Sequence, residues 1–191
     1  MIEYWFPTPV FCHDFTGSIL KRIQDEIHIN LDYITKDKKN SPWGDTVKTT
    51  FDNNLVNDVE TYQLLELKNA LFWAVDQYVT EIKYPEADFQ LIESWFNFCE
   101  KNGFQYDHTH PRCRISGVYY YQTNTEDGKL RFENPNPIMQ FNGFPSDRLP
   151  ISSVNYTPKI GRMVLFPSWL THRVNVNYTN HERISITFNL L

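Results

Sequence analysis

The chain has 191 residues, of which 41% are hydrophobic and 16% aromatic, which favours a domain with a sizeable core over a coiled coil or a disordered chain. A formal net charge of −5 and a pI of about 5.6 give no indication of a nucleic-acid partner held by phosphate contacts. Cys12, Cys99 and Cys113 are too few and too scattered for a disulfide framework. No stretch approaches the roughly 18 apolar residues of a membrane span, so we expect a cytoplasmic monomer or homodimer without a membrane partner.

The first 88 residues are predicted to form helices and loops that support the rest of the chain. An amphipathic helix is expected over residues 15–29, with Thr16 or Ser18 as its cap. Residues 30–57 are polar and are predicted to be irregular. A long helix is expected from about residue 59 to residue 82, where apolar side chains recur at three- and four-residue spacing.

Short aromatic and β-branched runs begin at Phe89 and predict about eight strands, separated by glycine, proline, asparagine and aspartate. The runs are residues 89–99, 114–122, 129–133, 138–141, 161–167, 172–176 and 183–191. This order of helices and strands favours a mainly β fold with flanking α-helices. We expect one domain over residues 1–191, in which 1–88 are helical and loop support and 89–191 form a closed or sandwiched core.

The last predicted strand, RISITFNLL, alternates between polar and apolar side chains. One face carries Arg183, Ser185, Thr187 and Asn189, and the other carries Ile184, Ile186, Phe188 and Leu190. One interpretation is a surface strand whose polar face lies in water. In the other, the apolar face lies under the helices and the polar face lines a cavity between two sheets, where Arg183 would need an anion.

Two histidines stand two positions apart in the segment YDHTHP. On an extended chain, the imidazoles of His108 and His110 project to the same side, as two ligands of one metal would. His172, at the start of a later predicted strand, can supply a third ligand. Neutral imidazoles with open coordination positions suit iron(II), zinc, copper or nickel. The alternative is two ordinary polar histidines in a loop.

Arg183 and Ser185 extend this set, because they follow His172 in the chain and share one face of a strand. A guanidinium forks onto a carboxylate with two parallel hydrogen bonds, and a serine hydroxyl can add a third. A metal with open positions beside a buried arginine and serine therefore fits a bidentate cosubstrate that carries a second, distal carboxylate.

The segments HTHP, SGVYYY, GRMVLFPSWLTHRV and ERISITFN resemble a family of 2-oxoglutarate/iron(II)-dependent oxygenases of marine bacteria and their tailed viruses. The segments WFPTPVF and ESWFNF are also similar, so the resemblance runs nearly end to end. It implies a double-stranded β-helix, or jelly roll, with iron(II) at one open end. The metal ligands that it implies are His108, His110 and His172.

The same resemblance implies contacts to the cosubstrate, 2-oxoglutarate. Arg183 and Ser185 would bind its distal carboxylate. Further contacts could come from Tyr119 or Tyr121 and from Asn97.

Position 110 departs from the pattern of the wider superfamily, which has an aspartate where this chain has His110. Three arrangements are open: an all-histidine triad, a triad that includes Asp107, and a triad that includes Glu133. We place the all-histidine triad first. Because it donates less charge, weaker metal binding or a different chemistry would follow.

The resemblance implies an oxygenase that hydroxylates a substrate C–H bond while 2-oxoglutarate is converted to succinate and carbon dioxide. Two other functions suit the same residues: a cupin-like, three-histidine dioxygenase that does not use 2-oxoglutarate, and a non-catalytic jelly-roll binding module. The substrate, whether a small molecule, a peptide or a protein, is left open. Loops that could border the site carry Trp43, Phe141, Phe144 and Trp169.

Overall fold

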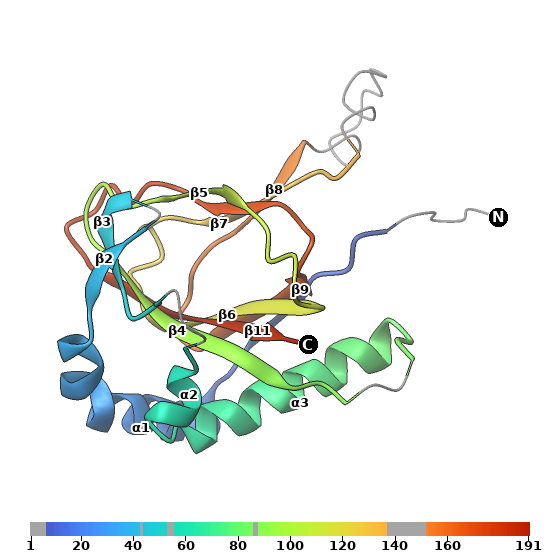
Figure 1. Cartoon of the computed structure of the whole chain (residues 1–191), viewed down its shortest axis with the longest axis horizontal. Helices are drawn as coiled ribbons and strands as arrows, with labels where there is room; N and C mark the ends of the chain where they lie inside the picture. Colours follow the sequence, from blue (N-terminus) through green and yellow to red (C-terminus); the bar gives the residue numbers. More distant parts are fainter. Residues whose placement is uncertain (1–6, 43, 53–55, 86–87, 137–151) are drawn as a thin grey trace.

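The computed structural model describes residues 7–42, 44–52, 56–85, 88–136 and 152–191, which form two antiparallel sheets with helices along one side (Figure 1). Within these residues, the larger sheet has seven strands in the order β1-β9-β6-β11-β4-β3-β2. The strand bounds, in that order, are Phe11–Asp14, Arg162–Pro167, Ile115–Gln122, Arg183–Leu190, Leu91–Cys99, Gly44–Thr49 and Lys39–Ser41. The smaller sheet has the order β5-β10-β7-β8, with bounds Gln105–His108, His172–Val174, Leu130–Glu133 and Ser153–Tyr156. The predicted mainly β fold with flanking helices is confirmed.

Helices α1 (Gly17–Lys36) and α3 (Leu65–Glu81) cover the outer face of the larger sheet. Ile23, Ile27 and Ile34 of α1 recur at helical spacing and are fully buried. Burying each such isoleucine stabilises the folded state by about 2 kcal/mol relative to leaving its side chain exposed. The predicted first helix is confirmed and continues to Lys36, while the expected cap Thr16 stands at the cap position without a side-chain capping hydrogen bond.

The long helix predicted over 59–82 is two helices, α2 (Asp58–Thr61) and α3. Gln63 adopts a φ of 53°, a left-handed conformation that ends a helix. The apolar spacing continues across the break because Val59 before it and Leu64 after it both join the core under the larger sheet. Periodicity therefore does not reveal the interruption.

Residues 30–57 are not irregular throughout, so that prediction is wrong. After α1 ends, β2 and β3 form an antiparallel hairpin, and β3 pairs with β4, with Val47 opposite Cys99. Strand β1 adds to the opposite edge by pairing with β9. Val47 is almost fully buried, yet the strand around it is polar, and its partner strand supplies the stability that the local pattern does not show.

Six of the predicted strands appear as β4, β6, β7, β9, β10 and β11. The run at 138–141 lies outside the described residues. Strands β5 and β8 are additional, and both are short and partly exposed.

No helix in the described ranges combines the length and apolarity needed to cross a membrane.

Strand β11 lies in the middle of the larger sheet, between β6 and β4. Its four apolar side chains belong to the core under the helices. Arg183, Ser185 and Thr187 line a cavity between the two sheets. The second interpretation of the alternating pattern is therefore confirmed, and one strand joins the helix-covered core to the cavity.

Candidate metal centre

Three histidines converge at one end of this cavity. His108 is the last residue of β5 and His172 the first of β10, and the two are direct partners in the sheet register. His110 lies two residues beyond β5, where its backbone N–H donates to the carbonyl of Ser168 at 2.9 Å. One ring nitrogen from each histidine lies within 4.8 Å of the others, a spacing that a single bound metal ion could span.

Hydrogen bonds orient two of the rings. Nδ1–H of His108 donates to the carbonyl of Tyr106 at 2.7 Å, and Nδ1–H of His172 donates to the carbonyl of Leu170 at 2.8 Å. The hydrogen on Nδ1 leaves a lone pair on Nε2, which is how histidine ligands are oriented in metalloproteins. These two histidines are thus held in the ligating tautomer by the backbone.

The imidazoles are neutral near physiological pH. Burial, together with the neighbouring histidines, lowers the pKa of His172 to about 3 and that of His110 to about 4. Burial also lowers the pKa of His108. Neutral imidazole is the form that binds a metal. In addition, Nε2 of His110 is buried with no hydrogen-bond partner among the described residues, so the donor set fits a divalent metal.

The two carboxylates considered as alternative ligands point elsewhere. Glu133 pairs with Arg131 at 2.7 Å, and both Glu133 and Asp107 pair with Arg173. Phe132 is the register partner of His172, so the adjacent Glu133 projects to the other face of the smaller sheet. Within the described residues, the metal-ligating group consists of the three histidines.

The cavity continues from the histidines to a polar wall. Besides the three histidines, Arg183, Ser185 and Thr187, its lining includes Trp95, Asn97, Gln105, Val118, Tyr120, Leu130, Phe166 and Val174. Asn97 donates to the hydroxyl of Thr187 at 3.0 Å and accepts from Gln105 at 3.4 Å. The predicted residues Arg183, Ser185 and Asn97 therefore lie on the same cavity as the histidines.

Tyr119 and Tyr121, which are predicted to contact the cosubstrate, do not line this cavity. Both side chains belong to the core under the helices, and Gln24 of α1 donates to the Tyr119 hydroxyl at 3.4 Å. The cavity is lined by Tyr120 instead, because alternate residues of β6 face opposite sides of the sheet. Three consecutive tyrosines carry no sign of which one faces inward.

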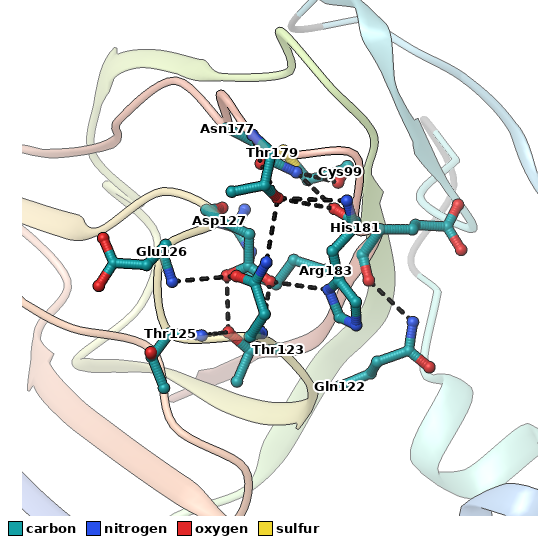
Figure 2. Close-up of polar contacts among 12 residues, drawn as sticks. Cys99, Gln122, Thr123, Thr125, Glu126, Asp127, Asn177, Thr179, His181 and Arg183 are labelled. Carbon is teal, nitrogen blue, oxygen red and sulfur yellow. Dashed lines mark hydrogen bonds and ion pairs between the residues drawn. The ribbon is translucent and has the colours of Figure 1, made fainter.

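Arg183 is held by a loop that sequence reasoning missed. Its Nη1 donates to the backbone carbonyls of Asp127 and Gly128 at 3.0 and 2.9 Å, whereas its buried Nε has no hydrogen-bond partner among the described residues. Figure 2 shows Asp127 and Arg183 close together, with His181 beside them. The Asp127 carboxylate accepts from the Thr123 hydroxyl at 2.6 Å and contacts Nδ1 of His181 at 3.1 Å.

Glycine is required at position 128. Its φ is +96°, and a Cβ there would lie 2.4 Å from the carbonyl oxygen of Asn175 and 3.0 Å from Nη1 of Arg183. The local signal was the dipeptide Asp127-Gly128, which is typical of a tight turn. Nothing in that signal indicates that the turn meets Arg183.

Of the loop residues expected to border the site, Trp169 precedes His172 by three positions and is 57% exposed. Trp43, Phe141 and Phe144 lie outside the described residues.

Comparisons with solved structures show the same fold. A prolyl-4-hydroxylase from Pseudomonas putida is 17% identical, with a TM-score of 0.61 over 96% of this chain and 92% of that chain. A prolyl hydroxylase from Trichoplax adhaerens, solved with a hypoxia inducible factor peptide fragment, is 16% identical, with a TM-score of 0.60 over 95% and 83%. HygX from Streptomyces hygroscopicus, solved with nickel, 2-oxoglutarate and hygromycin B, is 12% identical, with a TM-score of 0.61 over 96% and 82%.

No curated protein sequence matches the chain. A protein family described as "Putative 2OG-Fe(II) oxygenase" matches residues 93–189, about half of the chain. The match extends through β4, β6, β9 and β11 of the larger sheet and through the histidine-bearing strands β5 and β10. The chain therefore belongs to this family of 2OG-Fe(II) oxygenases.

Proposed function

We propose that this protein is an iron(II)- and 2-oxoglutarate-dependent oxygenase that hydroxylates a C–H bond of its substrate and releases succinate and carbon dioxide. The observation that carries the proposal is the position of Arg183. Its guanidinium lies on the same cavity as three neutral histidines, and its buried Nε has no partner among the described residues. A buried cation of this kind needs an anion, and a dicarboxylate cosubstrate would supply one.

The histidines would hold the metal. Three nitrogen ligands from His108, His110 and His172 leave coordination positions for a chelating cosubstrate and for dioxygen. Iron(II), when bound, supplies the redox chemistry by which one oxygen atom of dioxygen enters the product and the other enters succinate. The protein contributes the orientation of the rings through the carbonyls of Tyr106 and Leu170.

Arg183 and Ser185 would bind the distal carboxylate of 2-oxoglutarate. Because Nη1 is engaged by two backbone carbonyls, Nε and Nη2 form the edge of the guanidinium that would fork onto the carboxylate. Ser185, on the same face of β11, would add a hydroxyl donor. Asn97, the register partner of Ser185 on β4, would limit the sideways position of the ligand.

The cavity must enlarge when the cosubstrate enters. Its volume is about 30 Å³, whereas one water molecule needs about 10 to 15 Å³ on the same measure, so the space holds a few water molecules at most. Gln105, which reaches Asn97 across 3.4 Å, is a side chain whose movement would open space between the histidines and Arg183. We expect this movement to accompany binding of 2-oxoglutarate.

A second candidate is a three-histidine dioxygenase that does not use 2-oxoglutarate. The specific observation in its favour is that the described metal-ligating group contains no carboxylate. In that case the substrate itself would chelate the metal, and Arg183 would bind a carboxylate of the substrate.

An anaerobic titration of 2-oxoglutarate into iron(II)-loaded protein, followed by visible absorbance, separates the two candidates. Chelation of iron(II) by the keto acid is expected to produce a saturable charge-transfer band. Iron(II) binding without such a band would reject the proposed cosubstrate and favour the second candidate. Succinate formed in step with loss of 2-oxoglutarate under air would then test turnover.

A further inference from the structure

His110 differs from the other two histidines in what faces its Nδ1. The rings of His108 and His172 donate from Nδ1 to backbone carbonyls, whereas Nδ1 of His110 faces Nδ2 of Asn189 at 3.4 Å. The backbone N–H of His110 donates to the carbonyl of Ser168 at 2.9 Å, which fixes the position of the main chain that carries the ring. The partner of Nδ1 therefore determines which tautomer His110 adopts.

Two neighbours fix the orientation of the Asn189 amide. Its Nδ2 donates to Oε2 of Glu93 at 2.8 Å, and its Oδ1 accepts from the Ser116 hydroxyl at 2.8 Å. Asn189 is only 1% exposed, so these contacts are not exchanged freely for water. A carboxylate accepts only, which means that Glu93 requires the nitrogen end of the amide on the side that also faces His110.

This orientation is the wrong one for a metal ligand. When an amide hydrogen points at Nδ1 of His110, Nδ1 must carry the lone pair, and the ring hydrogen lies on Nε2. Nε2 is buried without an acceptor among the described residues. A metal at Nε2 needs the opposite tautomer, with the hydrogen on Nδ1 and an acceptor facing it.

We propose that Asn189 and Glu93 are positioning residues for the third metal ligand, and that the amide of Asn189 is reversed when a metal binds. In the reversed orientation, Oδ1 accepts from Nδ1–H of His110. Nδ2 then donates to the Ser116 hydroxyl, which in turn donates its hydrogen bond to the Ser168 hydroxyl at 2.8 Å. Glu93, which is half-buried, loses its donor and turns to solvent.

Glu93 thus acts as a latch that favours the metal-free arrangement. This inference rests on the metal site of the proposed function but not on 2-oxoglutarate. It also relates to the absence of an aspartate at position 110. The carboxylate of Glu93 lies near His110, and the amide of Asn189 stands between them.

The variant Glu93→Gln tests the latch, because its prediction opposes simple electrostatics. Removing a negative charge near a cation should weaken metal binding. In contrast, the new side-chain amide can donate to Oδ1 of Asn189 and so favour the reversed orientation. We expect Glu93→Gln to bind cobalt(II) about ten-fold more tightly than the unmodified protein, the lower end of the effects seen for groups that support a ligand.

The double variant Glu93→Gln with Asn189→Asp keeps the total charge and places a permanent acceptor at Nδ1, so it should bind cobalt(II) at least as tightly as the single variant. Glu133→Gln, on the outer face of the smaller sheet, removes the same charge without reaching the amide and measures the electrostatic effect alone. Cobalt(II) affinity at or below the unmodified level in both Glu93 variants would overturn the proposal.

Should the variants not fold, ¹⁵N NMR of the histidine rings in the unmodified protein decides. We expect the Nε2–H tautomer of His110 without metal and the Nδ1–H tautomer with zinc(II). The Nδ1–H tautomer in both states would show that no reversal occurs. Both measurements are made without 2-oxoglutarate, so their failure is distinct from failure of the proposed cosubstrate.

Discussion

His108 and His172 are register partners across β5 and β10, and their ring centroids lie 4.2 Å apart. One pair of strands in the smaller sheet therefore places two of the proposed metal ligands side by side. Arg183 stands on β11 of the larger sheet. Because the proposed metal ligands and the proposed cosubstrate clamp come from different sheets, substitutions should separate metal binding from binding of 2-oxoglutarate.

Replacing His172 with alanine should abolish stoichiometric binding of iron(II), because two imidazoles hold a divalent ion far more weakly than three. Metal content after anaerobic loading and desalting measures the effect. His28→Ala, at an exposed position on α1, is the matched control and should retain the metal. A full equivalent of iron in His172→Ala would remove this residue from the metal centre.

Arg183→Met should leave iron(II) binding intact and weaken 2-oxoglutarate binding by roughly 2 to 3 kcal/mol, the scale of a lost pair of charged hydrogen bonds. Anaerobic titration calorimetry with the iron-loaded variant gives both values. Arg173→Met, which removes an arginine paired with Asp107 on the opposite side of the smaller sheet, should change neither. Equal affinity in Arg183→Met and the unmodified protein would refute the clamp.

The metal-free protein should lose stability as the pH falls below about 6.5, the ordinary pKa of histidine. Burial holds the pKa of His172 at about 3 in the folded state. Below about pH 6.5 the unfolded chain therefore binds a proton at this histidine that the folded chain does not bind. This histidine alone accounts for a loss of up to about 3 kcal/mol between pH 7 and pH 4. Urea unfolding with a chelator present measures the free energy of unfolding at each pH. Between pH 7 and pH 4, His172→Gln should lose less of this free energy than the unmodified protein. Parallel pH profiles would contradict the low pKa.

Asp58 should have the opposite pH dependence. Its carboxylate is 3% exposed and accepts from the Thr50 hydroxyl and the backbone N–H of Phe96, and burial raises its pKa to about 6. The folded state therefore retains a proton between about pH 4 and pH 6, and stability falls as the pH rises through this range.

Asp58→Asn keeps an acceptor oxygen but cannot ionise. Relative to this variant, the unmodified protein should lose about 2 kcal/mol of unfolding free energy between pH 4 and pH 7. The difference between their unfolding free energies isolates Asp58, since both chains share the histidines. A difference that does not vary with pH would show that the carboxyl titrates normally.

The sequence could predict those parts of the site that depend on the alternation of side chains along a single strand. Alternation in β11 separates Arg183 and Ser185 from Ile184 and Ile186, and the structure places the two pairs on opposite faces of the sheet. The two-residue spacing of His108 and His110 likewise follows from extended backbone. Both patterns need only the direction in which consecutive side chains point.

The remaining parts depend on contacts between distant segments. Tyr119, Tyr120 and Tyr121 are chemically identical, and only the pairing of β6 with β11 and β9 shows that Tyr120 faces the cavity. The Asn189 amide meets His110 across 79 positions of the chain. Such relationships are set by sheet register, which no single run of residues contains.

The backbone carbonyls that bind Arg183 affect which positions near this site can change in sequence during evolution. A carbonyl is present whichever side chain the residue carries, so the grip on Nη1 by residues 127 and 128 does not itself depend on a functional side chain. Position 128 is constrained only by its need for glycine. Neighbouring loop positions can therefore change while Arg183 keeps its position. Under the proposed function, substrate preference could then change without loss of 2-oxoglutarate binding.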